Sequence, residues 1–279
     1  MSRLVFILFA IFSINVNAAT NKTGATVDWG YVGNKGPALW AQLNPDFKLC
    51  ASGKHQSPIN IPRKVRRADN ALAIHYHPAT VYIVEDGLTE LQLGSQQTII
   101  RDGHGIQINF HKHGIQINFQ ENTVPEMATY AGNDYRLVQF HFHTPGETEW
   151  RKQSYPAEIH FVHQGKNGKA LVIAVLVKAG APSREMQNII DHLPADHGQE
   201  HKMEPINPVS LLPENQHRYY SFAGSLTTPP CTEEGMQWVV MADTITASSA
   251  QIMLLRQAIG GPNARPVQPL NKRRVFLEG

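Results

Sequence analysis

The sequence has no long hydrophobic run and little net charge, and each shortage argues against a class of protein. A transmembrane helix needs about 20 apolar residues, whereas the apolar run from Leu4 to Phe12 has nine. The formal net charge is only +2 in 279 residues, so neither nucleic acid nor an anionic membrane is indicated as a partner. We therefore expect no stable membrane insertion and no nucleic-acid ligand. A chain of this length can bury a sizeable core.

Cysteine is also scarce, since the chain has only Cys50 and Cys231. Their state depends on the compartment, which the first residues indicate. Arg3 precedes the nine-residue apolar run, and Ala18 ends a stretch that is typical of a cleavage site. Residues 1–18 are therefore predicted to be a signal peptide, and the protein to be periplasmic or secreted. An oxidising compartment favours a disulfide between the two cysteines, although two unpaired buried thiols remain the alternative.

Strand patterns dominate the middle of the chain. Seven short alternating or β-branched runs are separated by Gly, Asn and Pro, at 81–84, 89–93, 97–100, 105–110, 135–142, 157–163 and 170–177. Helical periodicity is clear only at 183–193 and 246–259. No linker divides the core, so we expect one domain over 19–279. The expected fold class is mainly β with peripheral short helices (α+β).

One segment is repeated. HGIQINF occurs at 104–110 and again at 113–119, an offset of nine residues. Because nine is odd, one continuous strand would turn the two copies to opposite faces. The intervening His111-Lys112 lacks the Gly or Asn favoured in a two-residue hairpin. We interpret the repeat as a local duplication in which one copy occupies the functional place.

The most informative stretch is QFHFHTPGETEW at 139–150. His141 and His143 are two residues apart in a strand pattern, so their side chains leave one face. His160, on the next strand pattern, could complete a site of three nitrogens, with His163 also nearby in the sequence. Three histidines and one open position are typical of catalytic zinc. Glu158 shares the face of His160 and could hold that ring from behind.

Seven motifs along the chain together resemble the α-class carbonic anhydrases, particularly the exported bacterial type. They are WGY at 29–31, GKHQSPINI at 53–61, DGH at 102–104, QFHFHTP at 139–145, YPAEIHFVH at 155–163, GSLTTPPCTE at 224–233 and NARPVQPLN at 263–271. The resemblance implies a large, twisted, mostly antiparallel central sheet with a conical active-site cleft.

The resemblance also implies roles for particular residues. The zinc (Zn2+) ligands would be His141, His143 and His160. Thr227 would accept a hydrogen bond from the nucleophile, and Glu147 would accept one from Thr227. The substrate would contact Thr228, Val162, Val172, Leu226 and Trp238. The ligand rings would be hydrogen-bonded by Gln139, Glu158 and Asn263. The resemblance also implies a disulfide between Cys50 and Cys231.

The implied activity is the reversible hydration of carbon dioxide to bicarbonate and a proton by attack of a zinc-bound hydroxide. A histidine would carry the proton away. Sequence context favours His104 for this role, whereas the distance from the zinc histidines favours His113. The chain departs from the family pattern at Gly146, Thr148 and Trp150, which bears on the geometry around Glu147.

Two other functions compete with this hypothesis. A cupin-type metalloprotein would use Glu147 as a ligand, because HFHTPGE fits H-x-H-x3-E. An exported zinc-binding or zinc-buffering protein would account for the 14 histidines without catalysis. The sequence also leaves open whether the protein is a monomer or a homodimer.

Overall fold

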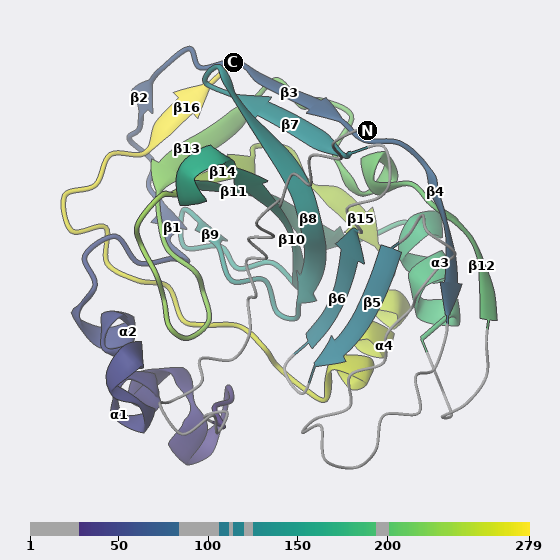
Figure 1. Ribbon diagram of the computed structural model, residues 1–279, viewed down its shortest axis with the longest axis horizontal. Helices are drawn as coiled ribbons and strands as arrows, with labels where there is room; N and C mark the ends of the chain where they lie inside the picture. Colours follow the sequence, from purple (N-terminus) through teal and green to yellow (C-terminus); the bar gives the residue numbers. More distant parts are fainter. Residues whose placement is uncertain (1–27, 84–105, 112–113, 120–124, 194–200) are drawn as a thin grey trace, which may run out of the picture.

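The computed structural model describes residues 28–83, 106–111, 114–119, 125–193 and 201–279 (Figure 1). The predicted signal peptide at 1–18, the predicted strands at 89–93 and 97–100, and both candidate shuttle histidines, His104 and His113, lie outside these residues.

A twisted twelve-stranded sheet forms the body of the described protein (Figure 1). Its main path runs in the order β2 (Arg66–Arg67), β16 (Phe276–Glu278), β13 (Tyr219–Ala223), β14 (Met236–Met241), β11 (Ala170–Ala179), β10 (Ala157–Gly165), β8 (Asn133–His143), β6 (Gly114–Phe119) and β5 (Ile106–His111). The strands off this path are β15 (Ile245–Ala247), β7 (Met127–Tyr130) and β3 (Leu72–His75). Most neighbouring strands are antiparallel, and the parallel pairs are β11 with β14, β11 with β15 and β16 with β2.

The remaining elements are small and peripheral. Two further strand pairs join β1 (Asn60–Ile61) to β9 (Glu149–Trp150) and β4 (Ala79–Ile83) to β12 (His201–Ile206). The α-helices are α1 (Trp40–Leu43), α2 (Leu49–Ser52), α3 (Arg184–Asp191) and α4 (Ser249–Ile259), and 3-10 turns lie at 33–35, 37–39, 45–47, 166–168 and 208–211. The predicted fold class, mainly β with short peripheral helices around a large twisted sheet, is confirmed.

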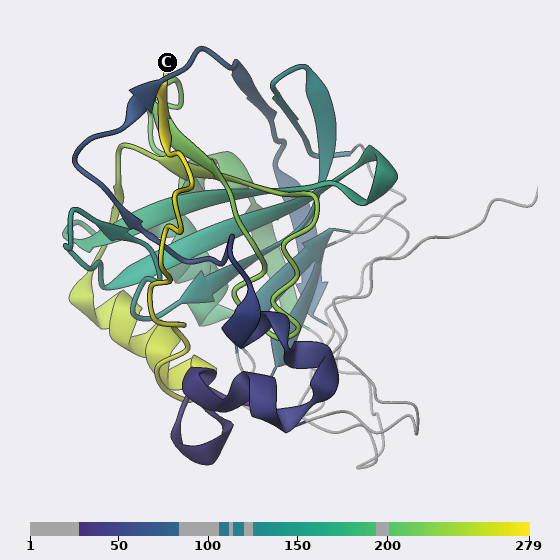
Figure 2. The same cartoon turned by 90° about the vertical axis from the view of Figure 1, so that its left-hand side faces the viewer.

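Alternation along β10 separates two apolar layers. Ile159 and Phe161 pack into a core cluster that also contains the buried faces of α3 and α4, and Figure 2 shows α4 lying along that side of the sheet. Val162 packs on the other side, against a cluster that includes Trp238. Because successive side chains of a strand point to opposite faces, His160 belongs to the side without α3 and α4.

The two copies of the repeat pair with each other. β5 and β6 form an antiparallel ladder in which Ile106 is opposite Phe119 and Ile108 is opposite Ile117. The two strands thus pair although the sequence His111-Lys112 lacks the residues favoured in a hairpin turn. The register explains this, since it sets apolar positions of one copy opposite apolar positions of the other. The second copy, in β6, is the one that pairs with β8.

Helix α4 begins later than the sequence pattern suggested. The prediction started it at Thr246, but residues 245–247 form β15 and pair with β11. Ser248 is the N-cap, and its side chain and that of Gln251 form a capping box. The helix ends at Gly260 in the left-handed conformation, as the two glycines there predicted.

Sequence reasoning missed the strands that follow residue 177. β13 and β14 pair with each other, and β14 continues the sheet from β11. Within the described ranges, no helix combines the length and apolar character needed to cross a membrane.

Candidate metal centre

Three imidazoles converge where β8 and β10 lie side by side. In the antiparallel register His160 is directly opposite His141, and His143 shares the face of His141 because it is two residues further along β8. One nitrogen of each ring lies within 4.8 Å of a nitrogen of each of the others. The spacing that predicted a shared face therefore brings these three rings together. His163, the fourth candidate, has a different environment.

His163 lies in the core rather than at the cluster of three rings. It is buried, its ring stacks on Tyr76, and its Nε2 lies 2.6 Å from the Tyr76 hydroxyl. Nδ1 donates to the carbonyl of Leu171 at 3.0 Å. Both ring nitrogens are thus occupied by protein groups.

Each of the three converging rings has an oxygen partner on its outer nitrogen. The pairs are His141 Nδ1 with Gln139 Oε1 at 2.7 Å, His143 Nδ1 with the Asn263 carbonyl at 2.8 Å, and His160 Nε2 with Glu158 Oε1 at 2.9 Å. A carbonyl or carboxylate oxygen can only accept, so these nitrogens donate. The proton on the outer nitrogen leaves a lone pair on the inner nitrogen of every ring, which is the form that binds a metal.

The inner nitrogens fit a divalent cation. His143 Nε2 is buried and has no hydrogen-bond partner among the described residues, which is costly unless a ligand satisfies it. Burial lowers the pKa of His143 and lowers that of His160 well below its ordinary value. Both rings are therefore neutral and able to act as ligands. Neutral nitrogen donors are typical of zinc.

Glu158 is held in place by several donors. Its carboxylate accepts from the backbone N–H groups of Glu147 at 2.7 Å and Thr148 at 2.6 Å, and from the Thr148 hydroxyl at 2.8 Å. Burial raises its pKa, while the bonds from Thr148 act in the opposite direction. The carboxylate is thereby fixed at the distance from His160 that its hydrogen bond requires.

Glu147 lies behind the histidines and does not belong to the cluster of converging nitrogens. Its Oε1 accepts from the backbone N–H of Arg265 at 2.7 Å and is 3.6 Å from the outer nitrogen of His143. Burial raises its pKa well above the usual range, and Glu158 raises it further, whereas the Thr227 hydroxyl lowers it. Oε2 is buried and has no well-formed hydrogen bond to a described residue. This position opposes the cupin hypothesis, which required Glu147 as a ligand.

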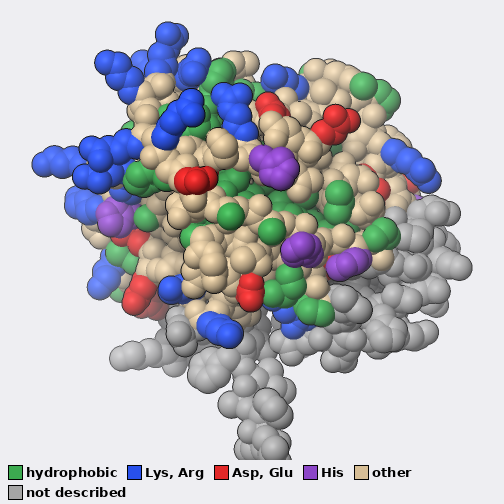
Figure 3. Space-filling model, turned by 90° about the horizontal axis from the view of Figure 1, so that it is seen from above, with side chains coloured by type: hydrophobic (Ala, Val, Ile, Leu, Met, Phe, Trp, Pro, Cys, Tyr) green, Lys and Arg blue, Asp and Glu red, His purple; other side chains and the backbone are tan. Residues whose placement is uncertain are grey.

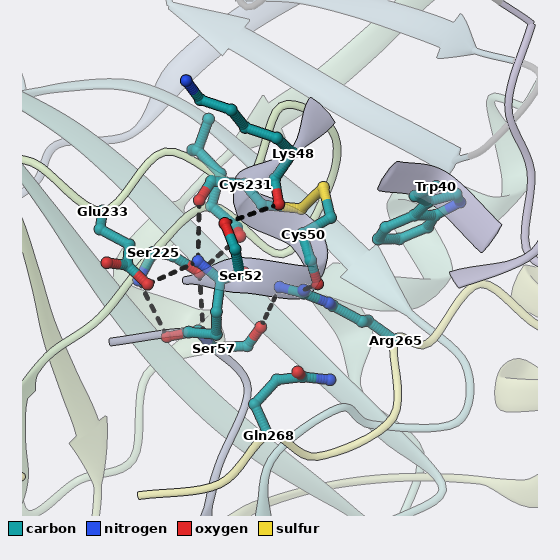
Figure 4. Close-up of a disulfide and its surroundings, with 12 residues drawn as sticks. Trp40, Lys48, Cys50, Ser52, Ser57, Ser225, Cys231, Glu233, Arg265 and Gln268 are labelled. Atoms are coloured by element: carbon teal, nitrogen blue, oxygen red, sulfur yellow. Dashed lines mark hydrogen bonds between the residues drawn. A yellow bond between two sulfur atoms is a disulfide. The ribbon is translucent and has the colours of Figure 1, made fainter. Parts of the chain in front are cut away.

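The loop that carries Thr227 and Thr228 is fastened by a disulfide. Cys50 and Cys231 are bonded, which confirms the predicted pairing, and the Cys231 N–H donates to the Thr228 carbonyl at 2.8 Å. Arg265 lies beside the disulfide and donates to the carbonyls of Cys50 and Ser57, at 2.9 and 2.7 Å (Figure 4). Arg265 thus links residues 50–57, which its side chain contacts, to Glu147, which its backbone N–H contacts.

An apolar wall borders the three rings. Trp238 is buried, and its ring centroid is 4.9 Å from that of His160, edge to face. Val162, Val172 and Leu226 belong to the same apolar cluster as Trp238. An apolar cluster therefore adjoins His160 through Trp238. The role that the resemblance gives these residues in binding substrate stays a prediction.

Two contacts were not foreseen from the sequence. Thr148 was noted only as a departure from the family pattern, yet its hydroxyl bonds Glu158. Arg265 was not singled out, although its N–H bonds Glu147. The only sequence signal for Arg265 is its place in the motif NARPVQPLN. Asn263 supplies its backbone carbonyl to His143, while its side chain bonds the backbone of Phe142 and Thr144.

Comparisons with known proteins agree with this geometry. Residues 35–279 match the family model of the eukaryotic-type carbonic anhydrases. A carbonic anhydrase of Neisseria gonorrhoeae is 37% identical over 253 residues, covering 91% of this chain and 89% of the relative. One of Pectobacterium carotovorum is 37% identical and covers 90% of this chain and 91% of its own.

A solved structure supports the same conclusion. The α-carbonic anhydrase of Thermovibrio ammonificans, in complex with the inhibitor sulfanilamide, superposes with a TM-score of 0.74 at 34% identity, covering 90% of this chain and all of that one. With the family model and the relatives, this shows that the chain is an enzyme of the eukaryotic-type (alpha) carbonic anhydrase family.

Proposed function

We propose that this carbonic anhydrase is a zinc enzyme that hydrates carbon dioxide reversibly to bicarbonate and a proton. The observation that carries the proposal is the set of three imidazole nitrogens within 4.8 Å of one another, each ring oriented by an oxygen on its outer nitrogen. His141, His143 and His160 would hold the zinc. Bound zinc supplies a nucleophile at neutral pH by lowering the pKa of water to about 7, the value established for carbonic anhydrases.

Thr227 orients the attack. Its hydroxyl faces the buried carboxylate of Glu147, and a hydroxyl that donates to a carboxylate keeps its own lone pairs for another donor. Thr227 would therefore accept a hydrogen bond from the attacking hydroxide and turn a lone pair of that hydroxide toward carbon. The Arg265 N–H holds Glu147 in the position this requires.

Carbon dioxide is apolar, so it would wait against the wall formed by Val162, Val172, Leu226 and Trp238. Thr228 would line the same place and contact the anionic product. An apolar surface excludes water from the reacting carbon without retaining the charged bicarbonate.

A histidine would remove the proton that each turnover releases, because an imidazole exchanges protons near neutral pH. We favour His104 over His113. In a hydration assay the His104→Ala variant should become limited by proton transfer and should recover partly in imidazole buffer. If His113→Ala shows this behaviour instead, the second copy of the repeat carries the shuttle.

We also propose export to the periplasm or the medium, with residues 1–18 as the signal peptide. The disulfide supports an oxidising compartment. Amino-terminal sequencing of the mature protein would test the cleavage site after Ala18.

The decisive experiment measures zinc content and carbon dioxide hydration on the same samples. Zinc-loaded protein should be active and inhibited by a sulfonamide, and the His141→Ala variant should lose both metal and activity. His217→Ala, which alters an exposed histidine, is the matched control and should retain both. Zinc binding without hydration would refute the proposed activity and favour the zinc-buffering alternative.

A further inference from the structure

A groove of about 610 Å³ lies away from the metal centre. Its lining residues are Asn60, Pro62, Arg63, Arg151, Lys152, Gln268 and Leu270. None of them was assigned a part in carbon dioxide hydration. Three are cations and two are amides, while none is acidic or aromatic. The volume is within the range of small-molecule sites, about 300–1,000 Å³.

Arg151 and Lys152 occupy a turn whose backbone conformation is unfavourable for these residue types. Trp150 and Gln153 exchange backbone hydrogen bonds of 3.0 Å in both directions. Arg151 and Lys152 form the connection, with φ of 53° and 67°. Positive φ at both central residues of such a turn favours Asn-Gly, and Arg and Lys adopt it at a cost in free energy. Strain of this kind commonly persists at functional positions.

The turn is also held in a fixed orientation. The Lys152 N–H donates to Asn60 Oδ1 at 2.9 Å, and the Arg151 N–H donates to the Ile61 carbonyl at 3.0 Å. The Arg151 guanidinium lies over the Trp150 ring, 4.1 Å from its centroid. The backbone of both cations and the Arg151 guanidinium are therefore positioned in advance of any ligand, which reduces the entropy lost on binding.

More cations lie next to the groove in the sequence. Lys64, Arg66 and Arg67 are exposed, and the last two form β2 at the edge of the sheet. None of these or of the three groove cations forms an ion pair with a described residue. Figure 3 shows Lys and Arg side chains gathered at the side where Figure 1 places β2. Because the chain's formal net charge is only +2, six cations here leave the rest of the chain net negative.

We propose that the groove and the adjoining row of cations bind a linear acidic polysaccharide, a sugar chain with carboxylates at regular intervals. Guanidinium groups pair with carboxylates in two-point geometry. The amides of Asn60 and Gln268 suit sugar hydroxyls, and Pro62 and Leu270 suit the apolar faces of sugar rings. A nucleic acid is disfavoured because single strands are usually held by aromatic stacking, which the groove lining lacks. A flat membrane is disfavoured because three of the cations line a hollow.

The test uses a variant that removes charge and improves the turn at once. Arg151→Asn/Lys152→Gly gives the turn its favoured sequence, so its melting temperature should be unchanged or higher. The matched control, Lys178→Gln/Arg184→Gln, removes two exposed cations that do not line the groove. Binding of a defined alginate oligosaccharide, a carboxylated sugar chain, would be measured by titration calorimetry at low and at higher salt.

Wild type and control should bind alginate with an affinity that falls as salt rises, and the Arg151→Asn/Lys152→Gly variant should bind at least ten-fold more weakly. Carbon dioxide hydration should be equal in all three. The proposal fails if wild type does not bind alginate at low salt, or if the Arg151→Asn/Lys152→Gly variant binds it as tightly as wild type does. It also fails if oligothymidylate or phosphatidylglycerol vesicles bind better than alginate.

Discussion

The hydroxyl of Thr148 provides a test of how affinity would be set at the proposed zinc site. It is fully buried and donates to Glu158 Oε1 at 2.8 Å, the same oxygen that accepts from His160 at 2.9 Å. The Thr148→Val variant removes this donor and keeps the branched shape. Glu158 would retain the two backbone donors at its other oxygen, so the carboxylate should stay near its place but with less restraint.

The expected magnitude follows from that single lost contact. A hydrogen bond to a charged group contributes about 1.5–3 kcal/mol, and about 1.4 kcal/mol corresponds to a factor of ten in an equilibrium constant. If the carboxylate orients His160 as argued, zinc should bind about 10- to 100-fold more weakly, the usual range for loss of a partner behind a metal ligand.

Zinc affinity would be measured by competition with a chelator of known affinity. Thermal unfolding of the metal-free protein serves as a separate measure of stability. Thr148→Ser keeps the hydroxyl and is the control, with affinity close to wild type. Unchanged zinc affinity in Thr148→Val would refute the reasoning, and so would an equal loss in both variants, since the hydroxyl could not then be the cause.

Three more predictions concern activity and stability. Thr227→Ala should lower the rate of carbon dioxide hydration severely, while zinc content, measured by atomic absorption, stays at the wild-type level. Normal turnover would contradict the orienting role of Thr227. Burial lowers the pKa of His163 to about 4, whereas the unfolded ring titrates near 6.5, so the unfolded state binds more protons between these values. Stability should therefore be full above pH 6.5 and fall by about 3 kcal/mol on going to pH 4. Denaturant titrations should show this fall in wild type and a smaller one in the Tyr76→Phe/His163→Phe double variant. The Cys50–Cys231 disulfide joins positions 181 residues apart. Its reduction should lower the melting temperature, with a loss of at most about 5 kcal/mol in the free energy of unfolding from loop closure. An unchanged melting temperature would contradict this.

Local patterns predicted much of the fold and of the ligand geometry. Alternation in β8 and β10 placed His141, His143 and His160 on one face, because strand periodicity is a local property. The two helices predicted from periodicity are present. The late start of α4 reflects β15, which pairs with β11, a strand far away in the sequence. Tertiary pairing of this kind overrides local preference.

The contacts that hold the ligands could not be derived in the same way. The Asn263 carbonyl reaches His143 over 120 residues of sequence, and the Arg265 N–H reaches Glu147 over 118. No periodicity relates such positions. Only the resemblance to a family pointed to Asn263, and Arg265 was not singled out although it lies in the same motif. The hairpin of β5 and β6 was missed for another reason, since the match between the two copies outweighed the unsuitable turn sequence.

The position of Asn263 and Arg265 in the chain has a consequence for biosynthesis. The ligands come from residues 141–160, but two of the groups that orient the centre are made more than 100 residues later. During translation the three histidines therefore emerge before the carbonyl and the N–H that fix His143 and Glu147. High-affinity metal loading should thus follow chain completion, an order that would suit the proposed export of the chain before it folds.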